Sequence, residues 1–233
     1  MNLYQANEVT KMLLEFKCSN HRSIKEKVSF SMIAGSDNTS EELLKKFGNF
    51  RILRSAVIYG ANGSGKSNFI SALSFMRDLV SNSINHQPGQ GVFQARHKLS
   101  AEETPSEYSI QFVRNDIRYA YGFSVKQNLI QDEYLYYFPR GRQVKVFERN
   151  GLDVRPGDRY KGVFDVSISI LKDNRLFLSC AANYSNIKEI EEAFMFFNTD
   201  IVVYNPEINN WTEYSIELMQ NNDMIKKVFV DML

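Results

Sequence analysis

The chain has 233 residues, 43% of them hydrophobic and 13% aromatic, which is enough apolar material for one large core or two modest ones. Its 28 lysines and arginines nearly balance its 27 acidic residues, so the net charge gives no reason to expect a polyanionic partner. The two isolated cysteines, Cys18 and Cys180, argue against a disulfide scaffold and a structural zinc site. With no signal pattern and no run of roughly 20 apolar residues, we expect a cytoplasmic protein without membrane association.

The N-terminal region is predicted to contain a small hairpin. Residues 1–11 are polar and aperiodic and are expected to form a loose extension. Strands at 14–19 and 27–32 follow, joined by the polar turn 20–23, which is typical of a hairpin at a sheet edge. A short helix is expected at 41–46.

The next segment has the order strand, glycine-rich loop, helix. Residues 54–59 end in the short apolar run Ser-Ala-Val-Ile-Tyr, which predicts a buried parallel strand. A glycine-rich stretch begins directly after it. Beyond that stretch, apolar residues recur at steps of three and four, as on one face of a helix: Phe69, Leu73, Met76 and Val80. We take 12–83 as one lobe of an α/β domain.

Residues 60–67 read Gly-Ala-Asn-Gly-Ser-Gly-Lys-Ser and match the phosphate-binding pattern GxxxxGK(S/T) completely. The glycines allow backbone N–H groups to approach phosphate oxygens, and the helix dipole places positive charge at the same point. Lys66 is expected to reach the β- and γ-phosphates as the catalytic cation, and the Ser67 hydroxyl to bind magnesium. The predicted nucleotide-binding residues are Gly60, Ala61, Asn62, Gly63, Ser64, Gly65, Lys66, Ser67 and Asn68. Because the guanine-reading motif Asn-Lys-x-Asp is absent from the sequence, ATP is favoured over GTP.

The middle of the chain predicts an antiparallel meander. Residues 84–104 are polar and aperiodic and are expected to form a loop. Apolar and small or polar residues then alternate strictly over 117–126, which indicates a half-buried strand. Neighbouring runs with plausible hairpin turns between them lie at 108–113, 129–138 and 143–149. We therefore place an inserted antiparallel β region of about four strands within 105–170.

The remainder, 171–233, is predicted to be mainly helical. Helices are expected at 187–197, 211–219 and 223–233, with a short strand at 201–204. Asp223 stands at the start of the last helix as a candidate cap. Because that helix reaches Leu233 without a stop signal, we expect the natural polypeptide to continue into the second half of an ATPase.

On these motifs the sequence resembles the ABC-type ATPases of the SMC/RecF/OLD kind. More narrowly, it is similar to the AAA-family ATP-binding proteins of bacterial abortive-infection and other anti-phage systems. The matching segments are 14–16, 20–24, 28–31, 59–68, 119–123 and 130–134, and the resemblance covers roughly 12–233. It implies a P-loop NTPase fold of the ABC-type ATPase head, with an inserted antiparallel β-meander and a C-terminal helical part.

The resemblance also implies a function and partners. ATP with Mg2+ would be bound between two protomers of a homo-oligomer. ATP binding would control an effector, either a partner protein or a fused C-terminal domain, in anti-phage defence or DNA transactions. In the family the basic residue matching Arg22 lies near the nucleotide, so Arg22 is a candidate phosphate or interface residue; the alternative is a surface arginine. His21 departs from the aromatic residue usual at its position.

Two motifs that such ATPases need for hydrolysis are missing from the sequence. There is no LSGG-like signature, and Tyr204, which ends the predicted strand 201–204, is followed by Asn205 rather than by the Asp-Glu of a Walker B motif. We therefore retain two hypotheses: an ATPase completed by missing sequence, and a non-hydrolysing assembly module that uses ATP occupancy. A small-molecule kinase ranks last, since no acceptor pocket or lid can be discerned.

Weaker signals remain. Residues 140–161 contain seven basic and three acidic residues with aromatics between them, which fits either a nucleic-acid contact or a solvated sheet edge. Glu133 is interpreted as structural. The histidines His21, His86 and His97 lack metal-ligand spacing, and no Asp-x-Asp pair suggests nuclease chemistry.

Overall fold

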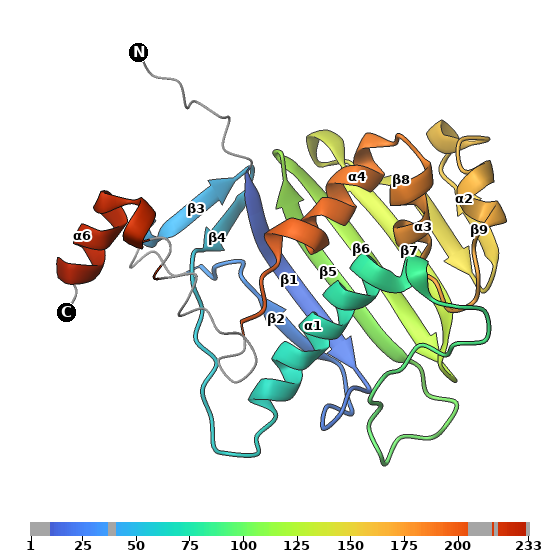
Figure 1. Ribbon diagram of the computed structural model, residues 1–233, viewed down its shortest axis with the longest axis horizontal. Helices are drawn as coiled ribbons and strands as arrows, with labels where there is room; N and C mark the ends of the chain where they lie inside the picture. Colours follow the sequence, from blue (N-terminus) through green and yellow to red (C-terminus); the bar gives the residue numbers. More distant parts are fainter. Residues whose placement is uncertain (1–9, 37–40, 205–215, 217–218, 232–233) are drawn as a thin grey trace. The chain divides into compact units, whose positions relative to one another are not determined.

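The computed structural model describes residues 10–36, 41–204, 216 and 219–231. By its internal contacts the chain forms two compact units, Met1–Ile201 and Val202–Leu233. They are described separately below (Figure 1).

The first unit is built on a seven-stranded sheet in which every neighbouring pair is antiparallel. Its strand order is β2-β1-β5-β6-β7-β8-β9. The strands are β1 (Lys11–Ser19), β2 (Val28–Ser31), β5 (Ser106–Arg114), β6 (Ile117–Lys126), β7 (Leu129–Phe138), β8 (Val144–Asn150) and β9 (Asp153–Pro156). The predicted hairpin of the N-terminal region is confirmed, with β2 at the sheet edge.

Tight turns explain why β5 to β7 form where the alternation predicted them. The two-residue turns Asn115-Asp116 and Gln127-Asn128 have positive φ at every position, between 49° and 63°, as hairpin turns that match the strand twist require. Strand β5 also pairs with β1, from Glu107 to Arg114. The strands of the 105–170 region therefore extend the sheet begun by the N-terminal hairpin.

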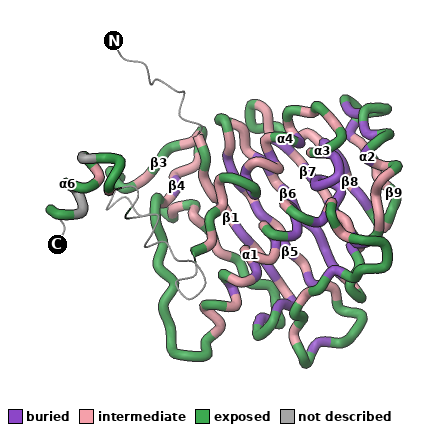
Figure 2. Tube along the Cα trace, viewed as in Figure 1, coloured by how far each residue is buried: buried purple, intermediate pink, exposed green. Residues whose placement is uncertain are grey.

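Helices cover one face of this sheet (Figure 1). They are α1 (Lys66–Asn82), α2 (Asp165–Ser169), α3 (Phe177–Tyr184) and α4 (Lys188–Met195), the last followed by a π-helical turn, Phe196–Asp200. Short 3-10 turns lie at Ser83–Asn85, Pro139–Gly141 and Asp158–Tyr160. Figure 2 shows the buried residues along the central strands and the helices above them.

The core between sheet and helices is largely aromatic. Its largest fully buried side chains are Phe16, Tyr108, Phe112, Tyr119, Tyr121, Phe147, Phe164, Phe177 and Phe197. Phe112 of β5 stacks on Phe196 with ring centroids 3.9 Å apart, and Phe16 meets Phe69 of α1 edge-on at 5.3 Å. Such offset and edge-to-face contacts add to the burial of apolar area. They fix α1 and the π turn against the first strands of the sheet.

The helix predicted at 41–46 is wrong. A 3-10 turn, Glu41–Leu43, leads into β3 (Leu44–Phe47), which pairs with β4 (Phe50–Leu53) as a two-stranded sheet. The turn glycine Gly48 has φ 52°, which favours a hairpin. Ile52 then packs against residues of β1 and β5, and this long-range contact overrides local helix propensity.

The buried parallel strand predicted at 54–59 is also wrong. These residues form no strand, and 85% of the Val57 surface and 91% of the Tyr59 surface are exposed. Within the described parts of the chain no strand pairs with them. Strand propensity reflects packing against neighbours, so an apolar run without a neighbour stays an extended connection.

Of the predictions for the C-terminal region, one helix is confirmed and one strand is wrong. The helix expected at 187–197 is found as α4 and the π turn, whereas 201–204 form no strand. Most of the helix expected at 211–219 lies outside the described residues.

In the second unit, α6 spans Asp223–Asp231. Its cap is Asn222 rather than the predicted Asp223, because the Asn222 Oδ1 atom accepts the N–H groups of Met224 and Ile225 at 3.1 and 3.2 Å. No helix of the described residues is long and apolar enough to cross a membrane.

Candidate functional site

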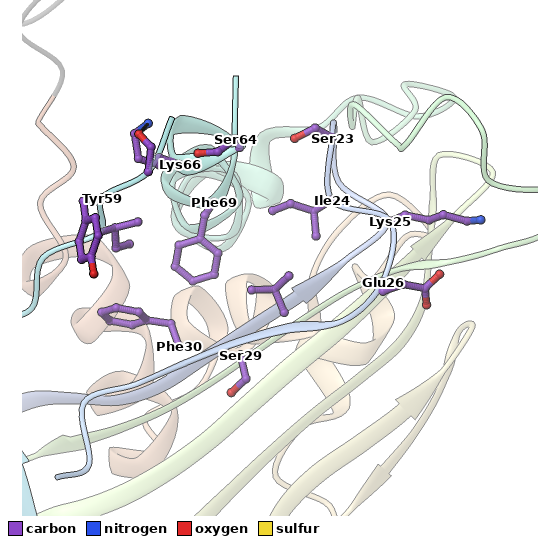
Figure 3. Close-up of a pocket in the computed structure, with 14 residues that line it drawn as sticks. Ser23, Ile24, Lys25, Glu26, Ser29, Phe30, Tyr59, Ser64, Lys66 and Phe69 are labelled. Atoms are coloured by element: carbon purple, nitrogen blue, oxygen red, sulfur yellow. Dashed lines mark hydrogen bonds between the residues drawn. The ribbon is translucent and has the colours of Figure 1, made fainter. Parts of the chain in front are cut away.

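The glycine-rich loop 60–65 leads directly into α1 (Figure 3). Gly63 and Gly65 have φ of 80° and 95°, a region that favours glycine. A Cβ on Gly65 would also lie 3.2 Å from the Ser23 Oγ atom, and one on Gly60 would lie 3.0 Å from the Ser64 Oγ atom. The loop is therefore as tight as its sequence predicted, and it needs glycine for both conformation and space.

The start of α1 presents backbone donors to solvent. The first helical hydrogen bond runs from the Phe69 N–H to the Gly65 carbonyl at 3.0 Å, so the amides of Lys66, Ser67 and Asn68 precede it without a partner in the helix. The exposed Ser67 lies in this first turn. Unpaired donors and the positive end of the helix dipole together suit a polyphosphate.

Lys66 lies against the loop itself. Its Nζ atom donates to the carbonyls of Gly60 and Ala61 at 2.7 and 2.9 Å. Across the described residues no carboxylate forms an ion pair with it. Its positive charge is thus held at the loop without a neutralising acid, where it adds to the attraction for an anion.

A hollow of about 580 Å³ adjoins the loop, within the usual size range of ligand pockets. Its lining combines loop residues with apolar side chains from α1 and the β1–β2 hairpin, among them Ile24, Phe30 and Phe69. Figure 3 shows Phe69 and Phe30 facing this space, with Tyr59 beside them and Glu26 pointing away from the loop. The site therefore has a polar loop on one side and an apolar wall on the other.

Arg22 lies on the turn next to the loop, but it does not line the hollow. It has φ 50°, its side chain is exposed, and its N–H donates to the Ala95 carbonyl at 2.6 Å. The turn touches the P-loop through Ser23 instead, whose Oγ accepts the Asn68 Nδ2 donor at 2.6 Å. Asn68 is thus placed against the turn. The sequence analysis missed Ser23, although it follows Arg22 directly in the turn.

His21 anchors the same turn from beneath. It is buried, with its Nδ1 atom 2.9 Å from the Tyr108 hydroxyl and its Nε2 atom 3.4 Å from the Ser71 hydroxyl. Burial lowers the pKa of His21 to about 4, and nearby Arg22 acts in the same direction. A neutral imidazole here packs beside Tyr108 and Phe75, as an aromatic side chain would.

Glu133 is structural, as the sequence analysis expected. It is fully buried and accepts hydrogen bonds from the backbone amides of Phe177 and Leu178 at 2.6 and 2.9 Å, and from the Tyr121 hydroxyl at 2.9 Å. Arg149 pairs with it at 3.2 Å. Burial raises the pKa of Glu133, while Arg149 and these donors act in the opposite direction.

The basic stretch 140–161 is largely neutralised by its own neighbours. Four of its seven cations are in ion pairs: Lys145–Glu148, Arg149–Glu133, Arg155–Asp153 and Lys161–Asp158. Arg140 and Arg142 are exposed. Nucleic-acid contact by this stretch stays a prediction. Among the described residues there is also no group of three or more His, Cys, Asp or Glu side chains that could hold a metal ion.

Comparison with protein families matches residues 55–161 to the family described as "AAA domain, putative AbiEii toxin, Type IV TA system". The resemblance to AAA-type ATPases of the abortive-infection group is thereby confirmed, and nucleotide binding is the function that the family implies. The matched AAA segment contains the P-loop, α1 and β5 to β9. A search of the curated proteins finds no match to the chain.

Proposed function

We propose that the chain binds ATP with magnesium at the P-loop, as the head of an ABC-type ATPase in which nucleotide binding controls an effector. The observation that carries this proposal is the exposed start of α1, where unpaired backbone donors, a glycine loop and the Lys66 ammonium converge. A phosphate chain would satisfy all three.

Each residue has a definite part in this proposal. The backbone of Gly63 to Lys66 would cradle the phosphates, and Lys66 would exchange its two loop carbonyls for phosphate oxygens. The exposed Ser67 hydroxyl is a suitable magnesium ligand. Magnesium, when bound, neutralises charge on the β- and γ-phosphates.

The hollow beside the loop would receive the nucleoside. Its apolar wall, formed by Ile24, Phe30 and Phe69, offers packing for a base and sugar. The ring centroids of Phe30 and Phe69 lie 5.7 Å apart. Phe69 belongs to the first turns of α1, so one helix would contact both the phosphates and the nucleoside. Without a guanine-reading motif, adenine remains the favoured base.

Hydrolysis needs a group that orients the attacking water. Of the described residues lining the hollow, Glu26 is the one carboxylate, and it points away from the loop (Figure 3). In the proposed ATPase this group would come from a second protomer or from further sequence. The same observation favours a second candidate, a non-hydrolysing module whose assembly depends on ATP occupancy.

The test is magnesium-dependent ATP binding and turnover by the chain, its Lys66→Ala variant and a matched Lys98→Ala control. Lys98 is exposed on the 84–104 loop and does not line the hollow. We expect Lys66→Ala to weaken ATP binding at least about tenfold and Lys98→Ala to leave it unchanged. Equal affinity in all three proteins would refute the site. Turnover that Lys66→Ala abolishes would favour the ATPase, and tight binding without turnover would favour the assembly module.

A further inference from the structure

A second hollow, of about 480 Å³, lies where three turns of the first unit meet. The β3–β4 turn contributes residues 47–50, the β5–β6 turn contributes Asp116, and the β7–β8 connection contributes Arg140 and Gly141. None of the residues lining this hollow lines the hollow beside the P-loop. It is therefore distinct from the proposed ATP site.

Arg118 of β6 lies in this hollow between two aromatic rings. Its guanidinium carbon is 3.7 Å from the centroid of the Phe138 ring and 5.3 Å from that of the Phe50 ring. Stacking on a ring leaves the N–H groups at the guanidinium edge available to an acceptor in the ring plane. The side chain is thus oriented by apolar contacts.

No carboxylate of the described residues forms an ion pair with Arg118. The contrast with Arg114 is direct, because Arg114 stands four residues earlier and is paired with both Glu192 and Asp200. Partial burial lowers the pKa of Arg118, with no anion to oppose the shift. A partly desolvated guanidinium with unused donors gains more from an incoming anion than a solvated one does.

The surroundings add charge and ring surface. Arg140 is exposed at the rim, on a turn with φ 53°, and Lys45 is exposed on the adjoining β3–β4 hairpin, where Lys46 pairs with Glu41. Asp116 is the one acidic residue in the lining. Phe47, Phe50 and Phe138 are each only half-buried, so their rings can still contact a ligand; basic side chains beside exposed rings are the means by which proteins hold nucleotide units.

We propose that this hollow binds a nucleoside phosphate, with the phosphate against Arg118 and Arg140 and the base packed on the rings of Phe47 and Phe50. The volume holds more than a phosphate alone, and the rings would be of no use to a simple inorganic anion. The ligand is either a free nucleotide or one unit of a single-stranded nucleic acid.

The test measures binding of two probes, AMP and a fluorescent single strand of about 12 nucleotides. Both are titrated against the wild-type chain and its Arg118→Gln, Arg140→Ala and Arg142→Ala variants. Arg142 is the matched control, since it is exposed on the same connection but does not line the hollow. We expect Arg118→Gln to weaken binding at least about tenfold, Arg140→Ala to weaken it several-fold, and Arg142→Ala to change it less than about twofold.

The two probes separate the sources of the ligand. Binding of AMP with this pattern supports a free nucleotide, and binding of the strand alone supports a nucleic acid. No binding of either probe, or equal losses in all three variants, overturns the proposal. If Arg118→Gln lowers the melting temperature, the binding of the Arg140→Ala variant decides the test, because the exposed Arg140 side chain can be removed without disturbing the fold. ATP binding at the P-loop should stay unchanged in these variants, so failure here would not be confused with failure of the proposed function.

Discussion

The first backbone amides of α3 and of α1, two helices of the same layer, have opposite surroundings. At the start of α3 the amides of Phe177 and Leu178 are bound by the buried Glu133 carboxylate. At the start of α1 the equivalent amides follow a glycine loop and face solvent. The same donors and dipole are present at both ends. The Glu133 carboxylate occupies the amides of α3, so that helix start is purely structural. No carboxylate of the described residues occupies the amides of α1, so they are available to a ligand.

The largest effect should come from removing the internal anion. Glu133→Ala leaves the Arg149 charge and the first amides of α3 buried without a partner, and we expect it to lower the free energy of unfolding by about 3–5 kcal/mol in urea denaturation. Asp158→Ala, which breaks the fully exposed pair with Lys161, is the control and should have no measurable effect. Equal stabilities for the two variants would contradict the view that the Glu133 carboxylate stabilises the start of α3.

The next comparison concerns the α1 end. Gly65→Ala and Gly89→Ala both place a Cβ at positive φ, and each should cost about 1 kcal/mol. Only Gly65 also faces a neighbour, the Ser23 Oγ atom at 3.2 Å. We therefore expect ATP binding to be lost in Gly65→Ala and kept in Gly89→Ala, as measured by equilibrium titration. If both variants bind ATP equally, the contact between turn and loop is irrelevant to the site.

A pH-dependent effect on stability should come from His21. Its folded pKa of about 4 lies below the ordinary value of 6.5, so the unfolded chain takes up the proton first. The stability that neutral His21 contributes is complete above pH 6.5 and is lost as the pH falls from about 6.5 to about 4. His21→Phe keeps an aromatic ring at the position and should flatten this part of the stability profile. Urea midpoints at pH 4.5 and 7 measure this loss of stability in each protein. An equal loss in the wild type and in His21→Phe would contradict the prediction.

What could be predicted from the sequence was what local rules decide. The helix α1, the strand β6 and the two-residue hairpin turns depend on residues close in sequence, and all were found where predicted. Their buried faces differ in detail, because Leu73 of α1 is only partly buried and Gly122 and Ser124, on the predicted solvent face of β6, are buried. The charged run 41–46 has good helix propensity, but Gly48 and the packing of Ile52 against other strands decide its structure.

The site was predictable to a similar degree. The loop 60–65 was read directly, because every part of it is contiguous. Phe30 and Ser23 escaped notice because they reach the loop from a separate hairpin. The Arg118 hollow could not be foreseen, since it requires three turns to meet.

The smallest expected effect concerns the connection that precedes the P-loop. Tyr59 is 91% exposed, so Tyr59→Ser should change the free energy of unfolding by less than about 0.5 kcal/mol. The fully buried Tyr121, which also donates to Glu133, is the matched tyrosine, and its replacement by serine should be severely destabilising. Hydrogen exchange sharpens the same contrast, because the amides of 55–59 should exchange far faster than those of β6. A loss of 1 kcal/mol or more in Tyr59→Ser, or protected amides at 55–59, would mean that this apolar run packs against a partner, as its sequence alone predicted.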